Sequence, residues 1–513
     1  MHKHAFVFLI AALLLPCKTQ GADCPQWGGS AARNMVSPEK NLPETFEPGQ
    51  KKGDSVDLAT AKNVKWAVHT GNFSCGTPAI AGGKVFQGAM ISGSGVLNCF
   101  DEATGKLLWQ WIKPCRTDMK ENPVDFAFRS VPGQMGVCST PTVEGDRLYF
   151  VDHNARVVCL DVNGRPPAPG ATVGEAREIW AFDMYADRNV GTRPSDSTNG
   201  SPLIDGDLIY VPTSNGVDRL YASLTKDAAR QCFAPKAPNL IVLDKRTGRF
   251  LAKDTAPIAA NMLHGQWSSP SMGVVNGRKL IFFGGGDGVC YAFNALAKAP
   301  AGPVTLKTAW WVNCIPPEYD SFTGMARIVQ YCQGIGWRPD TMNKGDGTFA
   351  GPSQIIATPV FDNNRVYVAI GRDPSHGRGR GALVCADATQ TGDITKTGKI
   401  WCYQGLDRSL STVSIADGLL YIADIAGRLH CLDAETGAVQ WIYETHSPIL
   451  ASTLVADGKI YLQTEKYLHI LAAGKEMKLL SKINLGAPSW ITPVAANGTV
   501  YIASKNYLWA VKQ

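Results

Sequence analysis

Three short stretches of the chain contain the side chains that could do chemistry. They read "LHGQWSSP" from Leu263, "FGGGDGVC" from Phe283 and "GRDPSHGRGRG" from Gly371. The candidate ligand-contacting residues in them are His264, Trp267, Asp287, Arg372, Asp373 and His376. An indole ring offers a flat apolar face, a carboxylate can act as a general base, and guanidinium groups bind anions through paired hydrogen bonds. Together these side chains indicate a ligand site or a surface for an anionic partner.

The same stretches also have a purely structural interpretation. "GGGDG" is a good tight-turn sequence, and Asp-Pro with a nearby glycine is ordinary loop chemistry. Three arginines, Arg372, Arg378 and Arg380, make the last stretch basic. Because Ca²⁺ takes about six to eight oxygen ligands, this loop suits an anion better than a cation. The sequence has no Gly-x-Ser-x-Gly pattern, no nucleotide-binding P-loop and no known metal-ligand spacing.

A phrase that recurs along the whole chain must position these residues. It reads "GTPAIAGGKVFQG" from Gly76 and "STPTVEGDRLYFV" from Ser139, and further copies begin at Gly200, Ser268, Ala357, Ser411, Ala451 and Ile491. A second phrase follows, as in "LNCFDEATGKLLW" from Leu97 and "GRLHCLDAETGAVQW" from Gly427. Self-similarity of this kind indicates a repeat architecture.

Each repeat is expected to be a small antiparallel sheet. "TPAIAGGKVFQG" predicts two alternating strands joined by a glycine turn, "LNCF" predicts a third strand, and "KLLW" after the "ATG" turn predicts a fourth. Four short strands repeated eight times favour an all-β fold, an eight-bladed β-propeller.

One repeat position decides how the cysteines are interpreted. The eight copies carry, in order, Cys99, Cys159, Val242, Ala292, Cys385, Cys431, Ile470 and Ala510. Since Val and Ala replace Cys there, the cysteine is predicted to be a small buried hydrophobe rather than a redox or metal-binding group. A second position carries Trp109, Trp180, Trp310, Trp401 and Trp441, which are predicted to pack between blades.

The last repeat ends at "YLWAVKQ" and lacks a fourth strand. Residues 63–71, "NVKWAVHTG", carry Trp66 in the tryptophan position and are predicted to complete the last blade. Closing the ring in this way removes an open sheet edge. The predicted organisation is therefore a signal peptide over residues 1–22, an N-terminal extension over 23–62 and the propeller over 63–513.

The first residues indicate export. A short basic start precedes an apolar run from Ala5 to Leu15, and small residues follow near Gly21 and Ala22. The run is shorter than the roughly 20 apolar residues of a membrane-spanning helix. "LLLPC" faintly resembles a lipidation signal at Cys17, but Pro16 replaces the expected small residue. We therefore expect a periplasmic or secreted protein rather than a lipoprotein.

Charge and cysteine content narrow the possibilities further. A formal net charge of +6 over 513 residues is mild and disfavours nucleic acid as a partner. Export permits disulfides, and Cys314 and Cys332, which share one long loop, are the expected pair. A monomer is expected.

Long insertions concentrate on one face. They span residues 112–135, 184–198, 215–239, 312–355 and 371–381, in connections that leave the same ends of the strands. Two other insertions, at 162–177 and 388–397, are expected on the opposite face and have less aromatic and histidine content. Because long loops on a rigid scaffold concentrate function, that face is the predicted binding face. His264, Trp267, Asp287, Asp373 and His376 are expected to converge there, near the fourth and fifth blades.

The repeat "SxPxVxxGxVYV…GxLxCLDAxTGxxxW" resembles that of the pyrroloquinoline-quinone-like (PQQ-like) propellers over residues 64–513. The opening "CPQWGGSAARNMVSPEKNLP" is similar to secreted members from planctomycete-type bacteria, which are grouped with the outer-membrane assembly factor BamB. Two branches share this fold. BamB-like scaffolds bind partner proteins, whereas quinoprotein alcohol dehydrogenases hold PQQ between a Trp and a ring of two adjacent cysteines, with Ca²⁺ and an Asp base.

This chain has neither adjacent cysteines nor a CxxCH haem motif, which favours the non-enzymatic branch. The resemblance thus implies a binding or scaffold protein without a firm cofactor, for a protein, anionic peptide or anionic glycan partner. In the enzyme alternative, PQQ with Ca²⁺ would be the cofactor, Trp267 would supply one flat face, and Asp287 or Asp373 would be the base. A carbohydrate- or peptide-binding propeller stays open through Tyr319, Phe322 and Trp337.

Overall fold

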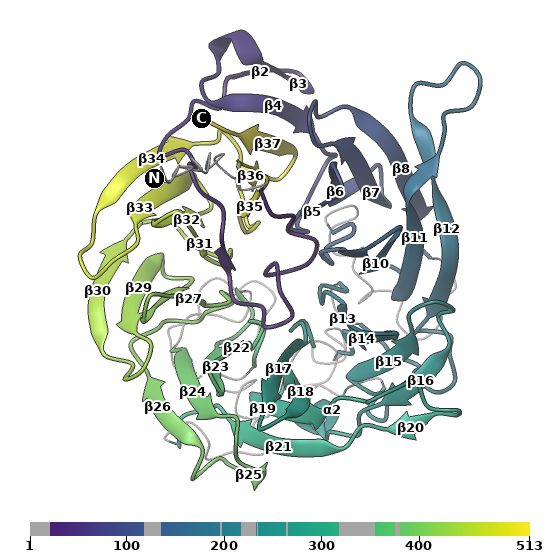
Figure 1. Cartoon of the computed structure of the whole chain (residues 1–513), viewed down its shortest axis with the longest axis vertical. Coiled ribbons are helices and arrows are strands. Elements are labelled where there is room, and N and C mark those ends of the chain that lie inside the picture. The colour runs from purple at the N-terminus through teal and green to yellow at the C-terminus, as the bar shows by residue number, and fades with distance from the viewer. Residues whose placement is uncertain are drawn as a thin grey trace, which may run out of the picture.

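The computed structural model describes residues 21–116, 135–194, 197–216, 232, 234–262, 265–317, 354–374 and 380–513. Within them, the main strands form eight antiparallel units of four, arranged around a common centre (Figure 1). The predicted all-β propeller is thereby confirmed, and these eight units agree with the predicted number of blades. In each blade the first strand lies nearest the centre and the fourth at the rim.

The first four blades run from the centre outward as follows. Blade 1 has β5 (Ala79–Ala81), β6 (Lys84–Ile91), β7 (Ser94–Asp101) and β8 (Leu107–Pro114). Blade 2 has β9 (Thr142–Glu144), β10 (Arg147–Val151), β11 (Arg156–Arg165) and β12 (Gly174–Asp183). Blade 3 has β13 (Leu203–Asp205), β14 (Leu208–Pro212), β15 (Leu240–Asp244) and β16 (Phe250–Lys253). Blade 4 has β17 (Ser271–Val275), β18 (Arg278–Gly284), β19 (Val289–Asn294) and β21 (Thr308–Asn313).

The remaining four blades complete the ring. Blade 5 has β22 (Val360–Asp362), β23 (Arg365–Ile370), β24 (Ala382–Asp387) and β26 (Lys399–Tyr403). Blade 6 has β27 (Ser414–Ala416), β28 (Leu419–Ala423), β29 (Arg428–Asp433) and β30 (Val439–Glu444). Blade 7 has β31 (Leu454–Ala456), β32 (Lys459–Gln463), β33 (Tyr467–Ala472) and β34 (Leu479–Asn484). Blade 8 has β35 (Val494–Ala496), β36 (Thr499–Ala503), β37 (Tyr507–Val511) and β4 (Val64–His69).

The predicted closure of the ring is confirmed by the last blade. The N-terminal strand β4 pairs antiparallel with β37, and Trp66 lies opposite Ala510. Outside the blades are the hairpin β2 (Gln50–Lys52) and β3 (Ser55–Asp57), the 3-10 turn η1 (Leu58–Thr60) and the short helix α2 (Ile258–Asn261). No helix in the described part of the chain has the length and apolar character needed to span a bilayer.

Three blades are also joined at the rim by inserted strand segments. The start of β12, the short β20 (Val304–Thr305) and the short β25 (Gly392–Asp393) each pair in parallel with the outer strand of the preceding blade. The inserted segments between strands 3 and 4 of blades 2, 4 and 5 therefore add hydrogen bonds between neighbouring blades.

The predicted cysteine position recurs in identical register in every blade. Cys431 of β29 lies opposite Tyr421 of β28 and Trp441 of β30. The residues at this position in the other blades are Cys99, Cys159, Val242, Ala292, Cys385, Ile470 and Ala510. All eight are at most 1% exposed. Burial raises the pKa of the Cys159, Cys385 and Cys431 thiols to about 12, so they stay protonated and pack as small hydrophobes.

The tryptophan position connects neighbouring blades, as predicted. The Trp441 indole N–H donates to the Gly474 carbonyl of blade 7 at 2.9 Å, and that of Trp66 donates to the Glu102 carbonyl of blade 1 at 2.9 Å. The indole of Trp66 also covers Gly105 of the "ATG" turn, where a Cβ atom would lie 2.8 Å from the ring. Glycine is required there for two reasons. A Cβ atom would be too close to the indole ring, and the φ of +73° lies in the left-handed region that favours glycine.

The Ser or Thr of the first repeat phrase forms a second set of contacts between blades. The Thr140 backbone N–H donates to the Ser201 hydroxyl at 3.0 Å, and the Ser201 N–H donates to the Ser269 hydroxyl at 2.9 Å. The chain of contacts Thr358–Thr412–Ser452–Thr492 repeats the arrangement across blades 5 to 8. These bonds satisfy backbone groups at the starts of the inner strands.

The N-terminal segment, residues 22–39, runs once around the inner strands. It starts beside Ile80 of blade 1 at Cys24, and the carbonyl of Pro25 accepts from Val143 of blade 2. It ends with β1 (Val36–Ser37), which pairs in parallel with β31 of blade 7. The contacts with the other blades are Arg33–Pro202, Arg33–Pro270, Ala32–Phe361, Met35–Val413 and Ser37–Ala495. These contacts together involve all eight blades. Figure 1 shows the segment in purple across the centre of the ring.

Arg33 holds this segment in place. Its side chain is fully buried, and it donates to the Pro202 carbonyl at 2.7 Å and the Pro270 carbonyl at 3.0 Å. A third bond goes to the carbonyl of Trp27 at 2.6 Å. Burying a charged group is costly unless its hydrogen bonds are satisfied, and here backbone carbonyls of two blades satisfy them.

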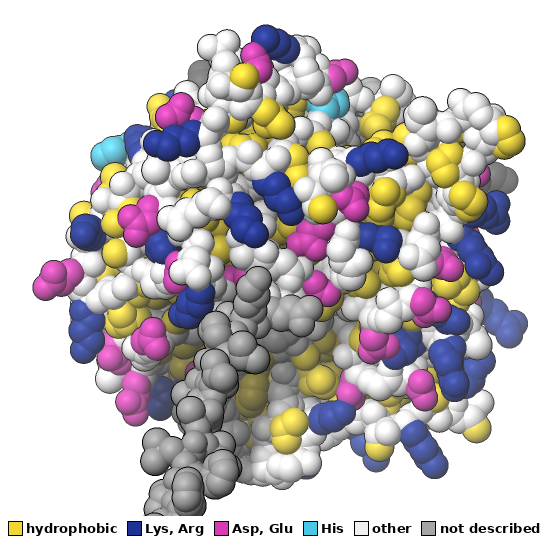
Figure 2. Space-filling model, turned by 45° about the horizontal axis from the view of Figure 1, so that its top comes forward, with side chains coloured by type: hydrophobic (Ala, Val, Ile, Leu, Met, Phe, Trp, Pro, Cys, Tyr) yellow, Lys and Arg dark blue, Asp and Glu magenta, His cyan; other side chains and the backbone are white. Residues whose placement is uncertain are grey.

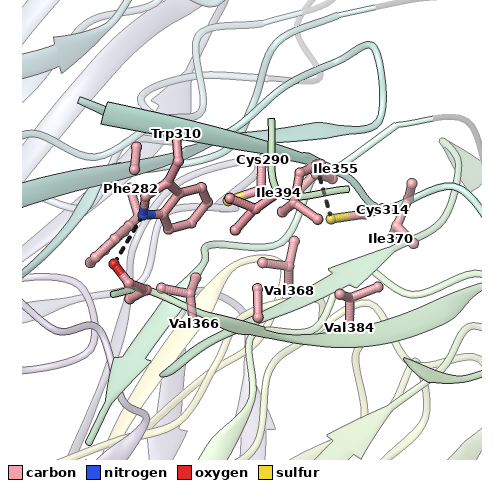
Figure 3. Packing of buried hydrophobic residues seen from close by; sticks show 14 of the residues in the cluster. Phe282, Cys290, Trp310, Cys314, Ile355, Val366, Val368, Ile370, Val384 and Ile394 are labelled. Carbon is pink, nitrogen blue, oxygen red and sulfur yellow. Dashed lines mark hydrogen bonds between the residues drawn. The ribbon is translucent and has the colours of Figure 1, made fainter. Parts of the chain in front are cut away.

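The predicted disulfide between Cys314 and Cys332 is wrong. Cys314 is a free thiol inside the apolar core between blades 4 and 5 (Figure 3), and Cys332 lies outside the described residues. Cys314 follows β21 and packs with Cys290 and Ile355, so its side chain points into the core instead of the loop. The disulfide that forms joins Cys75 to Cys138.

Candidate binding face

The ring has two different ends. At the turn end, short turns join strands 1 and 2 of every blade and strands 3 and 4 of blades 1, 3, 6 and 7, while longer connections join strands 3 and 4 of blades 2, 4 and 5. The N-terminal segment lies toward this end, because Asp23 accepts from Gly82 and Glu39 from Gly498, both in turns between strands 1 and 2. At the loop end, the connections that follow strands 2 and 4 leave the ring, including all five long insertions. The loop end is the candidate binding face.

Four of the six candidate residues are described by the structure: Trp267, Asp287, Arg372 and Asp373. The candidates His264 and His376 lie outside the described residues, as do Arg378 and the aromatic residues Tyr319, Phe322 and Trp337. The four described candidates lie at the base of the loops, near the strand ends.

The three candidate stretches do lie side by side, and Gln354 joins them. Its side-chain NH₂ donates to the Gly265 carbonyl at 3.2 Å, and its side-chain carbonyl accepts from the Asp373 N–H at 3.3 Å. The next residue, Ile355, donates its N–H to the Gly285 carbonyl at 3.0 Å. Gln354 is fully buried, so these contacts fix blade 4 against blade 5. Nothing in the sequence around Gln354 pointed to this role.

Asp287 and Trp267 are both engaged within the chain. The Asp287 carboxylate accepts from the Tyr291 hydroxyl at 2.7 Å and from the Val289 N–H at 3.1 Å, and it is 2% exposed. The indole of Trp267 donates to the Ser197 carbonyl at 3.1 Å, and its ring lies against Gly265, where a Cβ would approach it to 2.4 Å. Burial and the nearby Asp287 carboxylate raise the pKa of Tyr291, which keeps the hydroxyl proton available to that carboxylate.

Arg372 is fully buried within the chain, whereas the sequence predicted that it makes bidentate contacts with a bound anion. Arg380, eight residues later, is exposed and stays available for such a contact. The sequence could not predict which of the two arginines is buried. In a strand, buried and exposed side chains alternate, but a loop without regular strand geometry has no such pattern.

Next to Asp373, a buried acid organises the loop end of blade 6. Arg408 donates to the Pro374 carbonyl at 2.9 Å, and the neighbouring Asp407 N–H donates to Asp424 at 3.1 Å. The Asp424 carboxylate also binds Arg428 at 2.7 Å and His430 at 3.1 Å. Although burial raises the pKa of Asp424, these hydrogen bonds hold it below its ordinary value. Asp424 is thus an ionised structural group.

A second polar cluster lies where the insertions of blades 1 and 2 begin and end. Arg116 contacts both carboxylate oxygens of Asp183, at 3.1 and 3.3 Å. The guanidinium carbons of Arg116 and Arg193 lie 4.2 and 3.9 Å from the centre of the Tyr185 ring. Cation–π contacts of this kind keep the arginines in fixed positions. The sequence reasoning did not find this cluster.

Of the residues assigned to a quinone cofactor, Asp287 is 2% exposed and accepts from Tyr291 and from the Val289 N–H. A general base must lie within hydrogen-bond reach of the proton that it takes, and this burial keeps the Asp287 carboxylate away from the surface. In the described part of the chain, no group of three or more His, Cys, Asp or Glu side chains could hold a metal ion.

Comparisons with known proteins agree with the architecture. A family model described as "Outer membrane protein assembly factor BamB" matches residues 54–298 and 393–477. Among solved structures, a europium-containing methanol dehydrogenase has a TM-score of 0.55 at 12% identity, covering 94% of this chain and 90% of that one. BamB from Moraxella catarrhalis has a TM-score of 0.49 at 13% identity, covering 88% and 97%.

A quinohemoprotein alcohol dehydrogenase from Comamonas testosteroni has a TM-score of 0.47 at 12% identity, covering 95% of this chain and 80% of that one. No curated protein matches the sequence. At these identities the likeness to solved structures shows the fold alone.

Proposed function

The chain belongs to the family of the outer membrane protein assembly factor BamB, and on that premise we propose that it is an exported propeller that works by binding a partner at its loop end. The expected partner is a protein, or an anionic peptide or glycan. The closed ring leaves no blade without its fourth strand, so we expect a monomer.

The observation that carries this proposal is the asymmetry of the two ends. Residues 22–39 contact the inner strands of all eight blades, and both ends of this segment lie at turns between strands 1 and 2. Five of the long insertions leave from the opposite end, at 112–135, 184–198, 215–239, 312–355 and 371–381. A rigid ring with its own chain anchored at one end supports binding at the other end.

Charge at the loop end supports an acidic partner. Arg380 is exposed, and Lys113, near the end of the outer strand of blade 1, is exposed as well. On the face shown in Figure 2, by contrast, basic and acidic side chains are interspersed. That mixture differs from the clustered basic surface of nucleic-acid-binding proteins, so we do not propose nucleic acid as the partner.

Export is the second part of the proposal. The basic start, the apolar run from Ala5 to Leu15 and the small residues after it support a signal peptide, and hence a periplasmic or secreted location. The disulfide between Cys75 and Cys138 supports the same conclusion, because disulfides persist in oxidising compartments.

The test compares two charge-reversal variants of the exported protein. Lys113→Glu with Arg380→Glu changes the loop end, and the matched control Lys106→Glu with Lys475→Glu makes the same charge change at turns between strands 3 and 4. Each protein is used to capture partners from the cell envelope of its host, and the affinity for an identified partner is then measured directly. We expect the loop-end pair to weaken binding at least tenfold and the control to leave it unchanged.

Equal binding by both variants would remove the loop end as the binding face. A separate incubation with PQQ and Ca²⁺, followed by desalting, tests the enzyme alternative. Retained quinone absorbance together with PQQ-dependent alcohol oxidation would overturn the non-enzymatic proposal.

A further inference from the structure

The two ends of the N-terminal segment meet at one buried carboxylate. The backbone N–H of Ala22 donates to Glu39 Oε1 at 2.5 Å. The other oxygen, Oε2, accepts from the N–H of Gly498 in the turn between β35 and β36. Glu39 is only 5% exposed, whereas Gly21, Ala22 and Asp23 are exposed. The segment thus forms a closed loop that is joined at a glutamate and anchored on blade 8.

The surroundings of Glu39 are acidic. The Asn497 side chain donates to Asp23 at 2.9 Å and to Glu102 at 3.1 Å, and the Tyr501 hydroxyl also donates to Glu102. Among the described ion pairs, none joins Glu39, Asp23 or Glu102 to a Lys or Arg. Lys512, which follows β37, approaches the same turn, and its Nζ lies 3.9 Å from where a Cβ on Gly498 would sit. A buried carboxylate without a cation is costly, so this site favours a positive charge.

We propose that the chain is cut between Gly21 and Ala22 during export and that the new α-ammonium group of Ala22 forms an ion pair with Glu39. In the cut, water adds to the Gly21 carbonyl carbon and the C–N bond to Ala22 breaks. Gly21 leaves with a carboxylate, and the Ala22 nitrogen takes up protons to become an ammonium group. The catalyst is the endopeptidase that removes signal peptides. The inference rests on the export proposed above.

The position of the cut follows from sequence and exposure together. Signal-peptide cleavage needs small residues just before the cut, and Gly21 is the last residue of the segment removed, with Thr19 two positions earlier. Cleavage after Ala22, as in the boundary drawn from the sequence, would place Gln20 at that earlier position and would remove the residue that contacts Glu39. The structure therefore moves the boundary by one residue.

The contact between the Ala22 nitrogen and Glu39 means that the cut changes the stability of the ring. Before the cut, Ala22 offers Glu39 a neutral amide N–H; after it, the same atom carries a charge. The new positive charge adds Coulomb attraction to the hydrogen bond that the Glu39 carboxylate already accepts from this nitrogen. Maturation then tightens a loop that contacts every blade, so the mature ring is more stable than the precursor.

The first measurement is the N-terminal sequence and intact mass of protein recovered from the exported fraction. We expect the chain to begin at Ala22, and a chain that begins at Asp23 or later would overturn the inference. Cell fractionation is scored separately: protein held in the cytosol would contradict the proposed export, and the stability measurements below would still test the ion pair.

The second measurement uses recombinant chains of defined start. One begins at Ala22 and the other keeps Gly21, which moves the ammonium group one residue away; each is also made with Glu39→Gln and with the control Glu44→Gln, which changes an exposed carboxylate. An ion pair raises the pKa of the α-amino group above its ordinary value of about 7.7–8.0. Its contribution is therefore fully present below that value and is lost as the pH rises through the raised pKa.

At pH 7 we expect the Ala22 chain to melt about 1–2 °C higher than the chain that keeps Gly21, because melting shifts become smaller as chain length increases. The difference should vanish by about pH 10 and in Glu39→Gln, and it should persist in Glu44→Gln. Equal melting temperatures at pH 7, or a difference that survives Glu39→Gln, would overturn the ion pair.

Discussion

Cys75 and Cys138 occupy the same position of two successive repeats, and a disulfide joins them across the boundary between blades 1 and 2. Cys75 stands in "CGTP" and Cys138 in "CSTP", immediately before the inner strand of each blade. Equivalent positions of neighbouring blades lie close together because the ring repeats its geometry. The bond therefore links the first two blades near the loop end.

Removing this disulfide should destabilise the protein substantially. The bond closes a loop of 63 residues, for which the loop-entropy model gives about 4 kcal/mol. We expect Cys75→Ser with Cys138→Ser to lower the free energy of unfolding, measured by urea denaturation, by about 3–4 kcal/mol. Cys402→Ser, which changes an exposed cysteine outside this bond, is the control. An unchanged urea midpoint in the double variant would mean that the bond does not form.

The repeat register was sufficient to predict the blades but not the disulfide. The alternation of strands and the recurring Cys and Trp positions specify four strands per copy, and Trp66 identified the closing strand. The pairing of Cys314 with Cys332 relied instead on proximity along one loop. A comparison of the cysteines by repeat position would have identified the bond between Cys75 and Cys138, because equivalent positions of neighbouring blades lie close together in space.

The contacts of the N-terminal segment and of the candidate site could not be predicted. Arg33 donates to proline carbonyls and Gln354 to glycine carbonyls. Every residue has a backbone carbonyl, so such contacts leave no pattern in the sequence. The convergence of blades 4 and 5 was predicted from insertion length, whereas the burial of Arg372 and Asp287 depended on packing that only the structure shows.

The cysteine of the repeat should behave as a packing residue. Cys431→Ala removes one small buried group and should cost about 1–2 kcal/mol of unfolding free energy, by the cavity argument. Partner binding should be unchanged. Cys402→Ala should alter neither. Loss of binding by Cys431→Ala at unaltered stability would contradict the structural role.

Two glycines with the same backbone conformation allow the stability cost of backbone strain to be measured apart from the cost of a side-chain clash. Gly437 and Gly418 have φ of +74° and +75°, but a Cβ on Gly437 would lie 2.8 Å from the Trp401 ring, whereas a Cβ on Gly418 meets nothing within 4 Å. Gly418→Ala should cost about 1–2 kcal/mol from its backbone alone. Gly437→Ala should cost about 1–3 kcal/mol more. Equal losses in thermal or urea unfolding would show that the tryptophan does not pack on the turn.

Asp433, the aspartate of the "DAETG" turn, should make the stability of the protein depend on pH in the acidic range. Hydrogen bonds from the Thr436 N–H and hydroxyl hold the pKa of Asp433 below its ordinary value. Its contribution is therefore present above the unfolded pKa of about 3.9 and is lost as the pH falls through the lower folded value. We expect the wild-type protein to exceed Asp433→Asn in melting temperature at pH 7, with the gap closing toward pH 2.5. A gap that is constant with pH would contradict this.

The central claim is that the loop end receives the partner. Hydrogen–deuterium exchange of the protein with and without its bound partner tests the claim most directly. The account predicts protection of the described segments at the loop end, residues 135–141, 184–194 and 403–412, with the turns at 102–106 and 433–438 unchanged. Protection confined to those turns, with the loop-end segments unaffected, would contradict it.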